Sequence, residues 1–181
     1  LMRLIGGIDA PNAGAVVSDA RISWPVGLAG GFQTALTARE NVQFVCRVYG
    51  ATGVAMRRVL DFVEDFAEIG DYFNLPVKSF SSGMRSRVAF GLSMAFDFDY
   101  YLIDEVMAVG DAQFKAKSNA VMQERLKRAN VILVSHRMAD IARYCGVVVL
   151  VDQGSTVLYE NVKAGIAAYQ RIQRVEPHDM P

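Results

Sequence analysis

Apolar residues recur every three or four positions in two central stretches of the chain, and this spacing predicts two amphipathic helices. One stripe consists of Met56, Val59, Val63 and Phe66, and the other of Met84, Val88, Leu92 and Ala95. Gly70 is placed to end the first helix, because glycine readily takes the left-handed conformation of a helix C-terminus. Helical character begins upstream, at Thr37.

Outside these helices, short apolar runs alternate with more polar stretches, which is typical of an α/β protein. The pattern predicts strands near 100 and at 131–135, helices at 112–128 and 137–144, a hairpin at 147–159 and a last helix from Asn161 to about Arg174. Asp111 is the predicted N-cap of the helix at 112–128. Near the start of the chain, the runs 15–17 and 22–24 are predicted to pair as a hairpin.

Composition limits the classes of function that fit. The 181 residues are 52% hydrophobic, which suffices for one domain with a sizeable core. The 19 basic and 19 acidic side chains cancel, so no overall field favours nucleic acid. Cys46 and Cys145 lack the spacing of a metal site and are expected to be reduced thiols. Without a leader or an apolar run of about 18 residues, we expect a cytosolic protein that reaches membranes through a partner.

Two segments carry candidate chemistry. Ser81, Ser82 and Gly83 can cap the helix that follows, so that free backbone N–H groups and the positive end of the helix dipole face outward and suit a phosphate. The apolar run at 100–103 ends in the adjacent acids Asp104 and Glu105, at the carboxyl end of a predicted buried strand. One acid can serve Mg²⁺ and the other a water molecule.

These segments and three others resemble, in order, motifs of the ATP-binding subunits of ABC transporters. The matches are a Q-loop at 30–33 with Glu40 and Asn41 after it, a signature motif at 80–84, a Walker B motif at 101–105, a D-loop at 106–111 and a switch histidine at His136. The signature departs from the family pattern at its first, third and fifth positions. The particular residues of these motifs most resemble those of the branch that exports capsular polysaccharide, O-antigen or teichoic acid, above all the capsule exporters.

The resemblance implies an ABC-type P-loop NTPase fold, with a mixed sheet core flanked by helices. It implies a single domain at 1–181, with an inserted helical subdomain at about 37–96. The tail at 175–181 is expected to be flexible.

The resemblance also implies a role for each matching residue, with ATP and Mg²⁺ as cofactors. Glu105 would be the general base and His136 would contact the γ-phosphate. Asp104 and Gln33 would hold Mg²⁺. Ser81, Ser82 and Gly83 would reach the ATP bound by a second copy, and Asp111 would bridge the two copies.

Each of these residues also has an ordinary structural interpretation. In isolation, Gln33 and Asp111 would be read as a turn residue and a helix cap, and His136 as a local hydrogen-bonding group. Arg85 and Arg87 are expected to be exposed, with one of them able to bind a neighbouring carboxylate. Trp24 and Phe32 are expected to be packing residues, in a loop that is also a candidate contact for a permease.

No Gly-x-x-x-x-Gly-Lys-Ser/Thr sequence, the P-loop of such ATPases, occurs in the chain. We therefore expect the chain to be N-terminally truncated and inactive by itself, while the complete protein is an ATPase. Its expected partners are a permease, a second copy and a polysaccharide export assembly, at the cytoplasmic face of the bacterial inner membrane. The alternatives are a non-catalytic fragment that only associates with such partners and, disfavoured by charge, a nucleic-acid ATPase.

Overall fold

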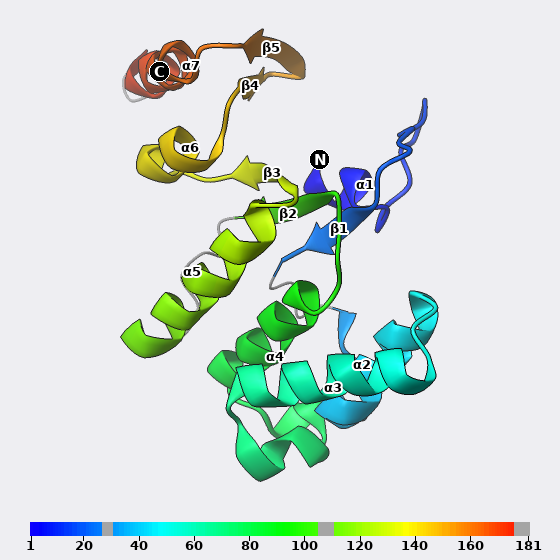
Figure 1. The fold of residues 1–181 in the computed structure, drawn as a ribbon. Helices are drawn as coiled ribbons and strands as arrows, with labels where there is room; N and C mark the ends of the chain where they lie inside the picture. The colour runs from blue at the N-terminus through cyan, green and yellow to red at the C-terminus, as the bar shows by residue number, and fades with distance from the viewer. Residues whose placement is uncertain (27–30, 105–110, 176–181) are drawn as a thin grey trace, which may run out of the picture. The chain divides into compact units, whose positions relative to one another are not determined.

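The computed structural model describes residues 1–26, 31–104 and 111–175 (Figure 1). The chain divides into two compact units, Leu1–Asn130 and Val131–Pro181, which are described one at a time. Most of the predicted tail, from 176 onward, lies outside the described residues. Within the described part, no helix has the length and apolar character needed to cross a membrane.

The strands of the first unit form a parallel pair. After a short helix, α1 (Met2–Ile5), strand β1 (Ile22–Pro25) lies beside β2 (Tyr100–Asp104). Three consecutive residues of β2, 101–103, are buried, as expected of a strand covered on both faces. The predicted hairpin between 15–17 and 22–24 is wrong, because Val17 is 88% exposed and β1 instead pairs with the buried strand β2.

Helices form the other layer of this unit. Its members are α2 (Ala38–Val48), α3 (Gly53–Ala67), α4 (Ser82–Met94) and the 3₁₀ turns Gly70–Asn74 and Val77–Ser79. Figure 1 shows these helices gathered on one side of β1 and β2. They enclose a shared apolar core that includes Val42, Val63 and Val88. Thr37 and Glu40 cap α2 reciprocally, which explains why helical character starts there.

Helix α3 ends earlier than the sequence predicts. Its last residue is Ala67, and Glu68 takes the left-handed conformation with φ of 51°. The prediction that Gly70 ends this helix is therefore wrong, since Gly70 begins the following 3₁₀ turn. A non-glycine residue in this conformation needs support from its surroundings, and Glu68 receives it from two ion pairs described below.

Helix α5 (Ala112–Leu126) lies against α4, and both helices place an aromatic ring against α3. The ring of Phe66 lies 5.6 Å from that of Phe90 and 5.2 Å from that of Phe114, so one ring from α3 contacts rings from α4 and α5. Gly91 permits this packing, because a Cβ atom there would lie 2.9 Å from Cδ1 of Phe66. The end of α3, the start of α5 and the interior of α4 thus share one aromatic junction.

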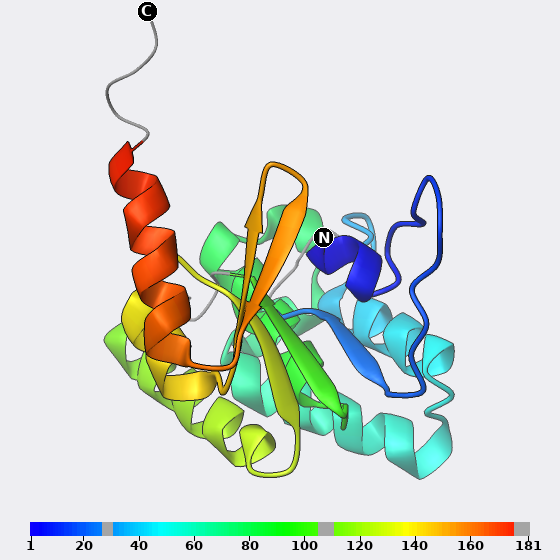
Figure 2. The ribbon, with the colours of Figure 1, turned by 90° about the horizontal axis from the view of Figure 1, so that it is seen from above.

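The second unit contains α6 (Met138–Tyr144), the antiparallel hairpin of β4 (Val148–Asp152) and β5 (Ser155–Tyr159), and α7 (Val162–Val175). Strand β3 (Asn130–Val134) leads into it. Helix α7 lies beside the hairpin (Figure 2), where a Cβ atom at Gly165 would come within 2.6 Å of Cβ of Val148. The predicted hairpin and final helix are confirmed, with the Asn161 side chain capping α7.

Candidate functional site

The predicted signature residues lie at the exposed N-terminal end of α4. Ser81 is the N-cap, and its Oγ accepts a hydrogen bond from the Met84 amide at 3.2 Å. Phe80 is buried and anchors the turn, whereas Ser81 and Ser82 are exposed. A Cβ atom at Gly83 would meet only Oγ of Ser81, at 3.8 Å, so the backbone there is open to approach. An open helix N-terminus of this kind fits a phosphate group.

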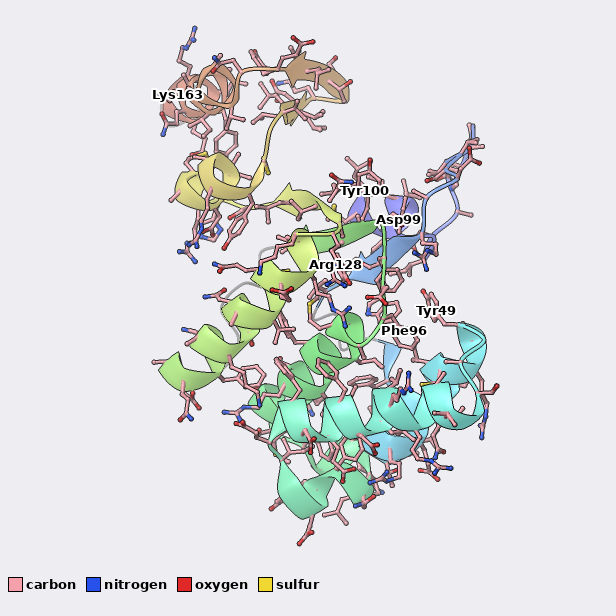
Figure 3. The ribbon with its side chains drawn as sticks, viewed as in Figure 1. Tyr49, Phe96, Asp99, Tyr100, Arg128 and Lys163 are labelled. Atoms are coloured by element: carbon pink, nitrogen blue, oxygen red, sulfur yellow. The ribbon has the colours of Figure 1, made fainter. Side chains whose placement is uncertain are left out.

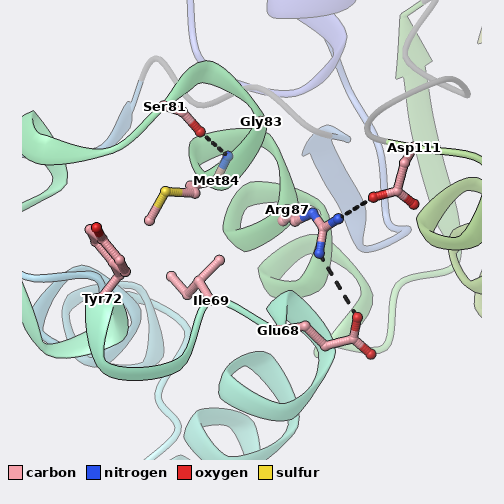
Figure 4. A pocket seen from close by; sticks show the side chains of 8 residues that line it. All are labelled: Glu68, Ile69, Tyr72, Ser81, Gly83, Met84, Arg87 and Asp111. Carbon is pink, nitrogen blue, oxygen red and sulfur yellow. Dashed lines mark hydrogen bonds and ion pairs between the residues drawn. The ribbon is translucent and has the colours of Figure 1, made fainter.

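This end of α4 forms one wall of a hollow of about 460 Å³ (Figure 4). The lining residues are Glu68, Ile69, Tyr72, Ser81, Gly83, Met84, Arg87 and Asp111. Ile69, Tyr72 and Met84 make one side apolar, and the three charged residues make the other side polar (Figure 4). The hollow therefore brings together two of the predicted site segments, the signature and the end of the D-loop.

Arg87 joins these two segments. Its guanidinium donates to Oδ2 of Asp111 at 2.7 Å, lies 3.8 Å from Oε2 of Glu68, and sits over the Phe114 ring at 4.5 Å (Figure 4). The expectation that both signature arginines are exposed is wrong, because the Arg87 side chain is only 20% exposed and Arg85 is half-buried. The expectation that one of them binds a carboxylate is confirmed.

Lys117 completes the charged network around Glu68. Its Nζ contacts Oε1 of Glu68 at 2.6 Å and donates to the carbonyl oxygens of Asp65 and Phe66 at the end of α3. The Lys117 hydrogen bond lowers the pKa of the Glu68 carboxyl below its ordinary value, and the Arg87 charge adds a smaller effect. Neither Glu68 nor Lys117 was predicted as part of the site, since only the fold brings them beside the signature helix.

Asp111 has the helix-cap role that its sequence position predicts. Its Oδ1 accepts from the Phe114 amide at 2.9 Å, and its other oxygen binds Arg87. The Phe114 amide, followed by the Arg87 charge, holds the pKa of the Asp111 carboxyl below its ordinary value. Bridging to a second copy remains a prediction for this residue.

Asn41 organises the segment that contains Gln33. Oδ1 of Asn41 accepts from the Gln33 amide at 2.7 Å, and Nδ2 donates to the carbonyl oxygens of Gln33 and Thr37. Asn41 is only 2% exposed, whereas the Gln33 side chain is exposed and open to a ligand. The backbone role of Asn41 was not predicted, although an asparagine among the apolar residues of a helix needs hydrogen-bond partners.

The same segment is bonded to the chain that leads into the signature. The carbonyl oxygens of Thr34 and Leu36 accept from the amides of Lys78 and Val77, each at 2.9 Å. The segment after Gln33 and the approach to Ser81 are therefore joined by backbone hydrogen bonds within the first unit.

Trp24 and Phe32 are packing residues, as predicted, since both are partly buried against the helical core. The Trp24 ring lies 5.2 Å from that of Tyr49 and 5.4 Å from that of Phe98. Tyr49, after α2, and Phe96, after α4, lie side by side with ring centroids 5.3 Å apart (Figure 3). These contacts join β1 to the helices.

Of the predicted acid pair Asp104 and Glu105, the structure describes only Asp104. Asp104 is exposed at the carboxyl end of β2, where an oxygen ligand for Mg²⁺ is expected, and Glu105 lies outside the described residues. Within the described ranges, no group of three or more His, Cys, Asp or Glu side chains could hold a metal by itself. A role of Asp104 in holding Mg²⁺ remains a prediction.

His136 belongs to the second unit. It is exposed and follows β3, in a turn where Oγ of Ser135 accepts from the Arg137 amide at 3.0 Å. Its predicted contact with a phosphate stays a prediction, because the two units are described separately.

No protein-family model matches the chain. Its sequence is 50% identical over 177 residues to the polysialic acid transport ATP-binding protein KpsT of Escherichia coli, covering 97% of this chain and 79% of KpsT. It is 40% identical over 172 residues to the capsule polysaccharide export ATP-binding protein CtrD of Neisseria meningitidis serogroup B, covering 95% of this chain and 78% of CtrD. The predicted resemblance to capsule exporters is thus confirmed.

Among solved structures, the chain resembles the dimeric ATP-binding cassette MJ0796 in a post-hydrolysis state with ADP and Pi. The TM-score is 0.63 at 20% sequence identity, and the match covers 86% of this chain and 78% of the other. This likeness confirms the predicted fold class.

Proposed function

The chain belongs to the ATP-binding subunits of ABC transporters for capsular polysaccharide export, and from this premise we propose that it drives export of a capsular or related cell-surface polysaccharide. The observation that carries the site-level proposal is the open N-terminal turn of α4. Ser81 caps it, and Gly83 leaves its backbone uncovered. A helix end of this kind attracts the triphosphate of ATP without a cationic side chain.

We assign the contact at this helix end to a nucleotide held mainly by a second copy. The backbone at Ser82 and Gly83 would face the terminal phosphates, and the Ser81 hydroxyl would both cap the helix and contact a phosphate oxygen. Asp111, fixed at the start of α5, would meet the second copy at the same interface. The dimeric cassette with ADP and Pi supports such a pairing by analogy.

The remaining residues would act on the nucleotide bound by the same chain. ATP, when bound, supplies the γ-phosphate that is transferred to water, and Mg²⁺ neutralises its charge. Glu105 would accept a proton from the attacking water, while Asp104 and Gln33 would orient the metal shell through their oxygen atoms. His136 would donate a hydrogen bond that stabilises charge on the phosphate oxygens.

We further propose a permease partner at the membrane. The helical layer within 37–96 and the segment after Gln33 are the candidate contact, because backbone bonds join that segment to the approach to α4. A displacement of the segment after Gln33 would then also displace the approach to α4, and the reverse. This places the subunit at the cytoplasmic face of the inner membrane, held there by its partner.

The 181 residues contain no P-loop sequence, and we propose that they bind ATP weakly by themselves. Micromolar affinity of the purified chain for ATP would refute this statement. The α4 end can nevertheless complete a site on another molecule. This gives a direct test of the proposed function with the chain as it is.

The test mixes the chain with a family member that carries a P-loop and whose catalytic glutamate has been neutralised. Sedimentation velocity should show association that requires ATP and Mg²⁺. Gly83→Asp should abolish it, because a carboxylate at the helix end repels the triphosphate. Gly146→Asp is the matched control, since Gly146 also faces open space and should leave association unchanged. Absence of ATP-dependent association for the unaltered chain would overturn the proposal.

A further inference from the structure

Arg87 is the one residue that contacts both carboxylates on the polar side of the described hollow. It lies on α4, one turn beyond the open helix end, and Asp111 begins α5. Glu68 follows the last residue of α3. One guanidinium thus links α4 to the end of α3 and the start of α5, and α4 and α5 carry predicted nucleotide-site residues.

We propose that Arg87 is a positioning residue, which fixes the signature end of α4 relative to Asp111 so that both meet a second copy in one geometry. This inference rests on the proposed function, and it names the residue through which two of the site segments act together. Arg87 does not itself contact nucleotide in this proposal. It acts through Asp111 and through the helix that it belongs to.

The geometry explains why an arginine is suited to this place. Its planar, forked guanidinium binds Asp111 through one nitrogen, approaches Glu68 through another, and lies over the Phe114 ring. A lysine would keep the charge but could not satisfy two carboxylates in fixed directions while covering a ring. Arg87→Lys should therefore retain only part of the function.

The partners of Arg87 are themselves held in place. Asp111 is fixed by its bond to the Phe114 amide, and Glu68 is fixed by Lys117, which also binds the carbonyl oxygens of Asp65 and Phe66. Because the carboxylates cannot simply follow the arginine, their positions define where α4 lies. The ring of Phe66 also contacts those of Phe90 and Phe114, so aromatic packing joins α3 to both α4 and α5.

Arg39 provides a matched control within the same unit. Its guanidinium binds Glu64 at 2.6 Å and lies 5.1 Å from the Phe73 ring, so it has a carboxylate and an aromatic partner as Arg87 does. Its partners, however, lie in α3 and the following 3₁₀ turn and include neither predicted nucleotide-site segment. Arg39→Met should cost stability without disturbing the α4 end.

The experiment measures two properties of Arg87→Met, Arg87→Lys, Asp111→Asn and Arg39→Met. The first is ATP-dependent association with the P-loop-bearing family member. The second is amide hydrogen exchange of the chain alone at Met84, Arg85 and Phe114, whose amides bond to Ser81 and Asp111. Asp111→Asn is included because asparagine keeps the helix cap and loses the charge that Arg87 binds, and its hydrogen exchange is measured on the chain alone, without the second copy that Asp111 is proposed to meet.

We expect Arg87→Met and Asp111→Asn each to weaken association about tenfold, as loss of one charge-assisted hydrogen bond predicts. In hydrogen exchange, the double variant should be little worse than Arg87→Met, because Asp111→Asn breaks a bond that Arg87→Met has already removed. Arg87→Met and Asp111→Asn should each speed hydrogen exchange at the amides of Met84 and Arg85. Arg87→Lys should keep part of the association that Arg87→Met loses. Arg39→Met should change neither association nor exchange.

Association and exchange of Arg87→Met that match those of Arg39→Met at equal loss of melting temperature would overturn the inference. If Arg87→Met fails to fold, hydrogen exchange of Asp111→Asn at Met84 and Arg85 decides, because association of this variant also reports the proposed contact of Asp111 with the second copy. If the unaltered chain does not associate, the proposed function fails, and the exchange data on the chain alone still decide whether Arg87 fixes the α4 end.

Discussion

Asn41 and Arg87 each connect a predicted site segment to the helices behind it, but with different chemistry. Asn41 is buried and neutral, and it bonds to backbone atoms on both sides of the segment after Gln33. Arg87 is partly exposed and charged, and its partners are carboxylates that water and salt can reach. A buried amide network loses much when one member is removed, whereas an exposed ionic network responds to pH and salt.

The two predicted site segments of the first unit are therefore held in place by different kinds of interaction. The segment at Gln33 is fixed as part of the folded core, because the Asn41 bonds are made whenever α2 is formed. The α4 end is fixed by charged side chains whose carboxylate partners are exposed to water and salt. Of the two, the position of the α4 end is therefore expected to depend more on pH and salt.

The largest expected effect comes from removing the buried amide. Asn41→Ala leaves the Gln33 amide without its partner and removes the bonds to the carbonyl oxygens of Gln33 and Thr37, which keep backbone donors, so it should lower the free energy of unfolding by about 2 to 3 kcal/mol. Urea unfolding followed by circular dichroism measures this loss. Asn74→Ala is the control, since exposed Asn74 accepts a single bond from Arg39 and should cost about 0.5 kcal/mol. Equal losses would contradict the importance assigned to Asn41.

A somewhat smaller loss is expected from the junction that supports Arg87. Gly91→Ala places a methyl group against the Phe66 ring, at 2.9 Å before relaxation, and should cost about 1 to 3 kcal/mol. The Phe66 ring cannot move freely, because it is packed against Phe90 and Phe114. Urea unfolding gives the loss, and faster hydrogen exchange at Phe114 would show that it reaches α5. A stability equal to that of the unaltered chain would show that the junction adapts.

Sequence alone predicted the site in part, because local signals are read directly from neighbouring residues. The capping role of Asp111 depends only on the first turn of α5. The partners of Arg87 could not be found in this way, since Glu68 lies 19 residues before it and Asp111 lies 24 residues after it. Their meeting requires the packing of α3, α4 and α5.

The errors in the predicted fold have the same origin. The runs 15–17 and 22–24 have the local pattern of a hairpin, yet β1 finds its partner in β2, whose buried residues come 75 or more positions later. Glu68 takes the place of the expected glycine at the end of α3, and its side chain is paired with Lys117 and Arg87, which follow it by 49 and 19 residues. In both cases a distant contact outweighs local propensity.

The smallest expected effect is on the pH dependence of stability, which should differ between the ionic network around Glu68 and the neutral network around Asn41. Lys117 holds the pKa of the Glu68 carboxyl below its ordinary value of 4.5, so this ion pair stabilises the fold fully above that pH. Protonation of Glu68 removes the contribution as the pH falls through the lowered pKa. The difference in melting temperature between the unaltered chain and Lys117→Met should therefore shrink between pH 7 and about pH 3.

The difference in melting temperature between the unaltered chain and Lys117→Met should not vanish at low pH, because Lys117 also binds the carbonyl oxygens of Asp65 and Phe66, which do not titrate. Asn41→Ala serves as the reference, since the bonds it removes involve no titrating group and its difference should stay constant over the same range. A Lys117→Met difference that is equally constant would mean that the Glu68 carboxylate contributes nothing to the folded state. Of the two ion pairs of Arg87, only the one with Asp111 would then be able to give the α4 end a dependence on pH.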